Sequence, residues 1–198
     1  FPTARTPGPG EVALTFDDGP RPPYTNQVIS ILQHEHVPAT FFVVGSVAVE
    51  HPDTLRLMAK LGYSVQNHSW YHKYLVNLTD SQLVAELQRV DKLIRSATGV
   101  QPTVLRPPYG LTSPRLVRLA SSVGLETVLW NAQAPTMNAN ARTILGAIEG
   151  SAAHRRRDGV GLTVLLHDGS GSSGEMVAAL PYLISYLRET GWKFVQLG

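Results

Sequence analysis

Short apolar runs alternate with longer amphipathic segments along most of the chain. Residues 12–16 and 40–44 are nearly continuous apolar stretches, as expected for strands that are buried on both faces. Between them, residues 24–36 repeat apolar side chains at the spacing of a helix. Further strands are predicted at residues 63–66, 103–106, 126–131, 162–167 and 193–197, and further helices at 55–61, 79–99, from 113 onward, 141–153 and 176–190.

This alternation predicts seven strands in one parallel sheet, joined by helices through right-handed crossovers. So many consecutive strand–helix units favour a small or incomplete barrel, with an open sheet as the alternative. With 198 residues, 43% of them hydrophobic, the chain has enough apolar side chains for one core. We therefore expect a single domain over residues 11–198, preceded by a flexible segment, residues 1–10.

The helix predicted at residues 79–99 has the clearest end signals. Thr79 and Gln82 have the spacing of a capping box, and Gly99 follows the last apolar position of the helix. Ser113 and Pro114 likewise suit the cap and first turn of the next helix. The capping residues at their ends thus support these two helices, which the apolar periodicity also predicts.

Charge and composition exclude several classes of protein. The 17 Lys and Arg residues nearly balance the 15 Asp and Glu residues, so no nucleic-acid-binding surface is expected, even with the basic run at residues 155–157. No apolar run approaches the ~18 residues of a membrane-spanning helix. Cysteine is absent, so any metal ligands must be nitrogen or oxygen atoms. The Pro- and Gly-rich residues 1–10 resemble the remnant left behind a processed leader and favour a secreted or envelope protein.

Carboxylates and histidines follow two of the predicted strands. Asp17 and Asp18 end the first strand, where one carboxylate can bind a metal while the other meets substrate; an Asp-rich turn is the alternative. His68 and His72 follow the third strand, and on a helical turn their spacing would put both rings on one face. Two imidazoles and a carboxylate would leave coordination positions open for water and substrate.

Two more strands end in residues that suit the same site. Arg106 precedes two prolines, and its planar guanidinium matches a carboxylate such as Asp17. His167 ends the strand at residues 162–167, where a structural core histidine is the alternative interpretation. Because parallel sheets build active sites at the carboxyl ends of their strands, we expect these side chains to converge.

In this order, the motifs TFDDGP (residues 15–20), HSWYH (68–72), RPPYG (106–110) and LLHD (165–168) resemble those of the polysaccharide deacetylase family, also called the NodB homology domain. The resemblance covers residues 11–197. It implies a distorted (β/α) barrel and a metal-assisted hydrolysis that removes acetyl groups from sugars. It also implies one divalent metal, with zinc expected and cobalt or another transition metal as alternatives.

Position by position, the resemblance assigns roles to individual residues. The metal ligands would be Asp18, His68 and His72, and Asp17 would be the general base. The remaining roles fall to Arg106 as the residue that orients Asp17, His167 as general acid, the Tyr109 backbone amide as oxyanion donor, Leu165 as the wall of the acetyl pocket and Trp130 as a substrate contact.

One family segment departs from its usual pattern. Where members carry two carboxylates and a second tryptophan after Trp130, this chain has Gln133, Thr136 and Met137. His167 thereby loses a neighbour that would favour its charged form. A slower enzyme, a substitute acid such as Asp168 or Glu175, a different acyl substrate, or loss of catalysis would each follow from this change.

The leading hypothesis is a monomeric deacetylase that acts on N-acetylglucosamine polymers of the chitin or peptidoglycan type, or on O-acetylated xylan. The alternatives are a metal-containing, non-catalytic glycan-binding module and a deacylase of a small-molecule amide. The glycosylation sequons at Asn67 and Asn77 are interpreted as chance matches, since the first would put a glycan beside a metal ligand.

Overall fold

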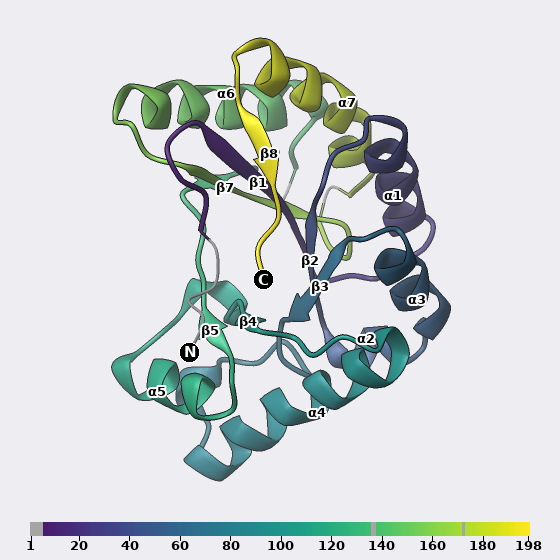
Figure 1. Ribbon diagram of the computed structural model, residues 1–198, viewed down its shortest axis with the longest axis vertical. Coiled ribbons are helices and arrows are strands. Elements are labelled where there is room, and N and C mark those ends of the chain that lie inside the picture. The colour runs from purple at the N-terminus through teal and green to yellow at the C-terminus, as the bar shows by residue number, and fades with distance from the viewer. Residues whose placement is uncertain (1–5, 136–137, 172) are drawn as a thin grey trace.

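The strands form one curved parallel sheet with the helices around its outer side (Figure 1). The computed structural model describes residues 6–135, 138–171 and 173–198. Strand order is β5-β4-β3-β2-β1-β7-β6, and β8 pairs with the start of β1. The strands are β1 (Glu11–Asp17), β2 (Thr40–Val43), β3 (Ser64–Asn67), β4 (Val104–Leu105), β5 (Glu126–Thr127), β6 (Ala132–Gln133), β7 (Leu162–His167) and β8 (Lys193–Val195). The predicted class, a distorted and incomplete (β/α) barrel, is confirmed.

Seven α-helices accompany these strands in the described part of the chain. They are α1 (Tyr24–His34), α2 (Gly45–Ala48), α3 (Pro52–Lys60), α4 (Asp80–Thr98), α5 (Pro114–Ser122), α6 (Ala141–Arg157) and α7 (Ser173–Glu189), with short 3₁₀ turns at Leu75–Asn77 and Pro108–Gly110. The capping box at Thr79 is present, Gly99 ends α4 in the left-handed conformation with φ 76°, and Ser113 caps α5. No described helix is long and apolar enough to cross a membrane.

The prediction of one strand over residues 126–131 is wrong, because β5 ends at Thr127 and a separate strand, β6, begins at Ala132. The pairing with β4 extends only as far as Thr127, and the backbone N–H of Val128 donates to Leu105 O at 2.9 Å. It then crosses to the opposite edge of the sheet, where Asn131 N–H donates to Thr163 O at 3.1 Å and β6 pairs with β7. This crossing brings Trp130 and Gln133 toward the same rim as His167.

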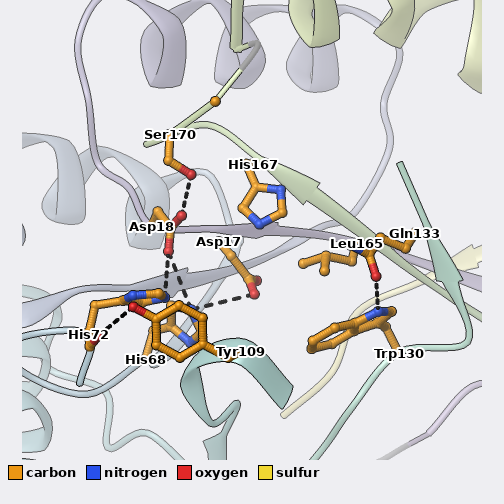
Figure 2. Close-up of a pocket in the computed structure, with 11 residues that line it drawn as sticks. Asp17, Asp18, His68, His72, Tyr109, Trp130, Gln133, Leu165, His167 and Ser170 are labelled. Carbon is orange, nitrogen blue, oxygen red and sulfur yellow. Dashed lines mark hydrogen bonds and ion pairs between the residues drawn. The ribbon is translucent and has the colours of Figure 1, made fainter. Parts of the chain in front are cut away.

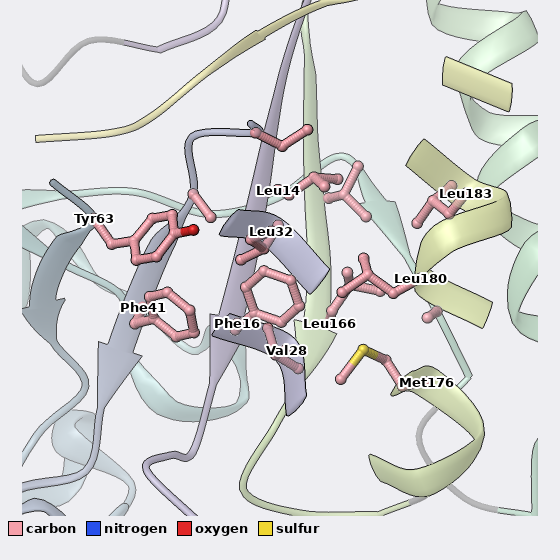
Figure 3. Packing of buried hydrophobic residues seen from close by; sticks show 14 of the residues in the cluster. Leu14, Phe16, Val28, Leu32, Phe41, Tyr63, Leu166, Met176, Leu180 and Leu183 are labelled. Atoms are coloured by element: carbon pink, nitrogen blue, oxygen red, sulfur yellow. The ribbon is translucent and has the colours of Figure 1, made fainter. Parts of the chain in front are cut away.

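Alternation along β1 separates the core from the site. Val12, Leu14 and Phe16 point outward into the main core, which α1 and α7 cover (Figure 3). Ala13 points the other way, into a second cluster. Asp17 is four residues further along β1 on the same face as Ala13, and it is 2% exposed. The core thus fixes the face on which the carboxylates lie.

The register of the sheet then aligns the predicted site residues. Asp17 pairs with His167 on one side and with Phe42 on the other. On the next strands, Asn67 pairs with Leu105, so the residues that follow them, His68 and Arg106, leave the sheet side by side. Residues 1–5 of the segment predicted to be flexible lie outside the described residues, so that boundary stays a prediction.

Candidate active site

A cavity of about 650 Å³ opens at the carboxyl ends of β1, β3 and β7 (Figure 2). Eight of the nine predicted site residues line it, and the ninth, Arg106, lies fully buried behind it. The lining residues are Asp17, Asp18, His68, His72, Tyr109, Trp130, Gln133, Leu165, His167, Ser170 and Gly171. In Figure 2, Asp17 and His167 lie between the Asp18–His68–His72 group and a wall formed by Trp130, Gln133 and Leu165.

Asp18, His68 and His72 form the cluster expected of a metal site. Their nearest ligand atoms all lie within 4.8 Å of one another. Asp18 Oδ1 is 3.4 Å from His68 Nε2 and 3.2 Å from His72 Nε2. Ligands about 2.1 Å from a tetrahedral ion are about 3.4 Å apart, so this spacing suits a shared ion. Asp18 Oδ1 is also buried and accepts no hydrogen bond from a described residue, so its lone pairs are free to coordinate a divalent cation. These residues therefore fit a metal with nitrogen and oxygen ligands.

The electrostatics of the cluster favour an ionised carboxylate at Asp18, a protonated imidazole at His68 and a neutral imidazole at His72. Burial alone would raise the pKa of Asp18, but the nearby His68 imidazole lowers it well below its usual range. Burial opposes protonation of His68, yet the nearby charges of Asp17 and Asp18 raise the pKa of His68. The pKa of His72 is lowered by burial and by the charge of His68. A bound cation would replace the proton shared within this group, because ligand imidazoles must be neutral.

The segment that carries the two histidines is a loop, so a helical turn at residues 68–72 is not the reason that the rings meet. Ser69 and His72 adopt left-handed conformations with φ of 65° and 54°. The carbonyls of Ser69 and Trp70 accept backbone hydrogen bonds from Gly45 (3.0 Å) and Ser46 (2.9 Å), and not from residues of their own segment. The loop is thus shaped by its neighbours, and it still brings the two ring centroids to 5.0 Å.

Two contacts orient the metal ligands. The Arg106 carbonyl lies 2.7 Å from His68 Nδ1. Because a carbonyl can only accept, Nδ1 carries the proton and Nε2 faces the metal position. Ser170 donates its hydroxyl to Asp18 Oδ2, which leaves Oδ1 to the cluster. Sequence reasoning missed Ser170, and its only signal was the Gly- and Ser-rich loop after the LLHD motif.

Asp17 and Arg106 form the predicted ion pair. Arg106 Nη1 donates to Asp17 Oδ1 at 2.8 Å and to Thr15 Oγ1 at 2.6 Å. The guanidinium is fully buried and lies 4.1 Å from the centre of the Phe42 ring. The carboxylate of Asp17 is thus held at the cavity wall with one oxygen fixed, and its Oδ2 is 3.6 Å from His68 Nε2.

His167 faces the same cavity without a fixed partner. No described residue forms a hydrogen bond with its ring, and burial lowers the pKa of His167 although Asp17 and Asp18 act in the opposite direction. Gln133 accepts a hydrogen bond from Trp130 Nε1 at 3.0 Å, so its carbonyl is engaged with the wall of the cavity. Thr136 and Met137 lie outside the described residues. Neutral imidazole is therefore favoured at His167.

Neither substitute acid lines the cavity. Asp168 is fully buried, accepts a hydrogen bond from Thr25 Oγ1, and has its pKa raised to about 7 by burial. Glu175 accepts a hydrogen bond from the backbone N–H of Ala141 at 2.9 Å, at the start of α6. Of the three candidate proton donors, His167, Asp168 and Glu175, only His167 lines the cavity.

The two remaining predicted residues lie on opposite sides of the cavity. Tyr109 has a left-handed backbone (φ 62°), and its ring packs edge-on against His72 with centroids 4.7 Å apart. Leu165 belongs to β7 and is 3% exposed, with its side chain at the wall beside Trp130. An acyl group between these walls would meet an apolar surface on one side and the predicted Tyr109 amide on the other.

Comparison with known proteins agrees with this geometry. The sequence profile described as polysaccharide deacetylase matches residues 4–128. The chain belongs to the polysaccharide deacetylase family. It is 34% identical to the peptidoglycan-N-acetylmuramic acid deacetylase PdaC of Bacillus subtilis over 98% of this chain and 40% of PdaC. It is 33% identical to a peptidoglycan-N-acetylglucosamine deacetylase of Bacillus cereus, over 93% of this chain and 84% of that protein.

The fold of this deacetylase-family chain also matches a solved structure. The crystal structure of the Bc1960 peptidoglycan N-acetylglucosamine deacetylase with a hydroxamate-type benzamide superimposes with a TM-score of 0.89 at 26% identity, covering 98% of this chain and 89% of that one. The profile match ends before Trp130, so it does not include the altered segment at Gln133 or the residues of β7.

Proposed function

We propose that this chain is a divalent-metal-dependent deacetylase that hydrolyses the acetamide of N-acetylglucosamine units in a polysaccharide of the chitin or peptidoglycan type. The observation that carries the proposal is the position of Asp17. It lies in the same cavity as the Asp18–His68–His72 cluster and is held by a buried arginine at 2.8 Å. A carboxylate fixed next to a metal position is placed to act as a general base.

Each residue predicted for the site then has a chemical task. Zinc, or a similar cation, would polarise the acetyl carbonyl and lower the pKa of a bound water. Asp17 takes the proton of the attacking water, and Arg106 keeps its carboxylate in place. The backbone amide of Tyr109 donates to the developing oxyanion, and His167, in its protonated form, delivers its proton to the leaving amine and becomes neutral. Leu165 and Trp130 enclose the methyl group.

The relatives support a cell-wall substrate. Two of them are named as deacetylases of peptidoglycan sugars, and another from Bradyrhizobium as a chitooligosaccharide deacetylase. O-acetylated xylan is a second substrate class, because the same arrangement can hydrolyse an ester. We place the protein outside the cell or in the envelope, acting as a monomer.

Acetate release provides the test. The purified protein, loaded with Zn²⁺ or Co²⁺, is incubated with N-acetylglucosamine oligomers, peptidoglycan and acetylated xylan, with and without a chelator. Release from the amino-sugar substrates, its loss with the chelator and its recovery on adding metal are expected. Asp17→Asn should lower the rate by at least about 10²-fold while metal binding is retained. Release that persists in Asp17→Asn would exclude the assigned base.

A second candidate, a metal-containing glycan-binding module without catalysis, is favoured by one observation. His167 has no hydrogen bond to any described residue, and burial lowers its pKa, so the cavity holds a weak reserve of protons at neutral pH. Oligosaccharide binding without acetate release from any of the substrates would decide for the module. Release from N-acetylglucosamine oligomers would decide for the enzyme.

A further inference from the structure

A buried amide links helix α4 to the loop that carries the two histidines. Asn67, the last residue of β3 and the neighbour of His68, is fully buried. Its Nδ2 donates to Leu87 O at 2.9 Å and to Asp91 Oδ1 at 2.8 Å. Its Oδ1 accepts the backbone N–H of Ser69 at 2.8 Å. Because Asn67 is fully buried and both of its amide hydrogens are donated, a glycan on Asn67 is incompatible with the folded protein.

Asp91 is unexpected on its side of α4. Its neighbours in the chain, Leu87, Val90 and Ile94, are fully buried apolar residues, and Asp91 itself is only 5% exposed. A buried carboxylate loses its hydration, and the Asn67 amide is the only described side chain that compensates it by a hydrogen bond. A leucine there would join the surrounding core. Residues that break such a local rule are found most often where they support function.

The loop needs such support because its conformation is unfavourable by itself. Ser69 and His72 both have positive φ, a region that side chains with a Cβ rarely adopt. The Asn67–Ser69 hydrogen bond fixes the backbone at the first of these residues, directly between the two ligands. Helix α4 holds the loop a second time at Trp70, whose N–H donates to Glu86 Oε2 at 3.0 Å and whose ring lies 3.6 Å from the Arg89 guanidinium.

We propose that Asp91 is a positioning residue of the metal site. By orienting the Asn67 amide, it holds the Ser69 backbone in the conformation that brings His68 Nε2 and His72 Nε2 to Asp18. The inference rests on the proposed function only in that Asp18, His68 and His72 bind a divalent metal. It assigns α4, a helix that does not reach the cavity, to the retention of that metal.

Metal affinity tests the inference apart from catalysis. The dissociation constant of Co²⁺ is measured by competition with a chromophoric chelator, together with the Co²⁺ absorption spectrum and the melting temperature of the metal-free protein. Asp91→Leu should raise the dissociation constant by about 10- to 100-fold, the usual effect of losing an outer-shell partner, and should change the Co²⁺ spectrum. Asp91→Asn keeps an acceptor oxygen and should stay within about threefold of the unaltered protein.

Ile94→Ala is the matched control, because Ile94 is equally buried on the same helix and belongs to the apolar core. It should lower the melting temperature and leave the affinity for Co²⁺ unchanged. If Asp91→Leu does not fold, Asp91→Ala carries the same test, since alanine removes the acceptor without adding volume. Unchanged affinity in the folded Asp91 variant, or an equal loss of affinity in Ile94→Ala, would overturn the inference. Tight Co²⁺ binding without acetate release would refute the proposed activity alone.

Discussion

The buried ion pair between Arg106 and Asp17 gives the sharpest prediction of stability. The guanidinium is fully buried and Asp17 is 2% exposed, so neither charge is hydrated. Arg106→Met fills a similar volume but leaves the Asp17 carboxylate buried without its main cation. Removing one partner of a buried pair costs ~3–5 kcal/mol, a large share of the ~5–15 kcal/mol that stabilises a typical domain. For a chain of this size, that loss corresponds to a fall in melting temperature of roughly 6–20 °C.

Urea unfolding followed by circular dichroism measures this loss, with a chelator present so that metal binding does not contribute. The double variant Asp17→Asn/Arg106→Met should recover more than half of the lost stability, because no uncompensated charge is left. Arg115→Met is the control, since Arg115 pairs with Asp80 at the same 2.7–2.8 Å range but at the surface. An exposed pair contributes less than ~1 kcal/mol.

Two results would refute this reasoning. A loss below ~1 kcal/mol in Arg106→Met would mean that water or another cation compensates Asp17 in the folded protein. Equal losses in the single and the double variant would mean that Arg106 stabilises the fold through its packing on Phe42 rather than through charge, since the two groups lie 4.1 Å apart.

Three further predictions concern other parts of the molecule. Burial raises the pKa of Asp168 from 3.8 to about 7, so between these pH values the folded state keeps a proton that the unfolded state releases. Stability should therefore fall as pH rises from about 4 to 7, by up to ~4 kcal/mol relative to Asp168→Asn in urea titrations with chelator. Gln133→Glu adds a negative charge to the cavity and should raise the pKa of His167, which a shift of the pH–rate profile to higher pH would reveal. Thr79→Ala removes the cap of α4 and should cost ~1 kcal/mol by urea unfolding, whereas an unchanged midpoint would contradict the cap's contribution.

Much of the fold could be predicted because each central strand is buried on both faces. Thr40–Val43 and Leu162–His167 are nearly continuous apolar runs between turns, and their observed ends lie within one residue of the predicted ones. Strand β6 could not be predicted in the same way. It has two residues, and only its pairing with β7, across the opening of the sheet, makes it a strand.

The convergence of the site could be predicted from topology, but its supports could not. Asp17 and His167 are 150 positions apart, and parallel pairing alone brings them together. The contact between Ser170 and Asp18 depends on how a Gly- and Ser-rich loop folds back, which no periodicity encodes. The spacing of His68 and His72 suggested a helical turn, yet four-residue spacing does not determine a backbone whose hydrogen bonds go to other parts of the chain, among them α2 and α4.

The two sides of the cavity differ in how firmly their residues are held. On the metal side, each of Asp18 and His68 has a second contact that fixes its orientation, through Ser170 and the Arg106 carbonyl. On the acid side, His167 has no hydrogen bond to a described residue, and Gln133 is committed to Trp130. A change on the acid side can therefore alter proton delivery without loosening the metal ligands. This separation explains how the chain can depart from the family pattern after Trp130 and still keep the geometry of the Asp18–His68–His72 cluster.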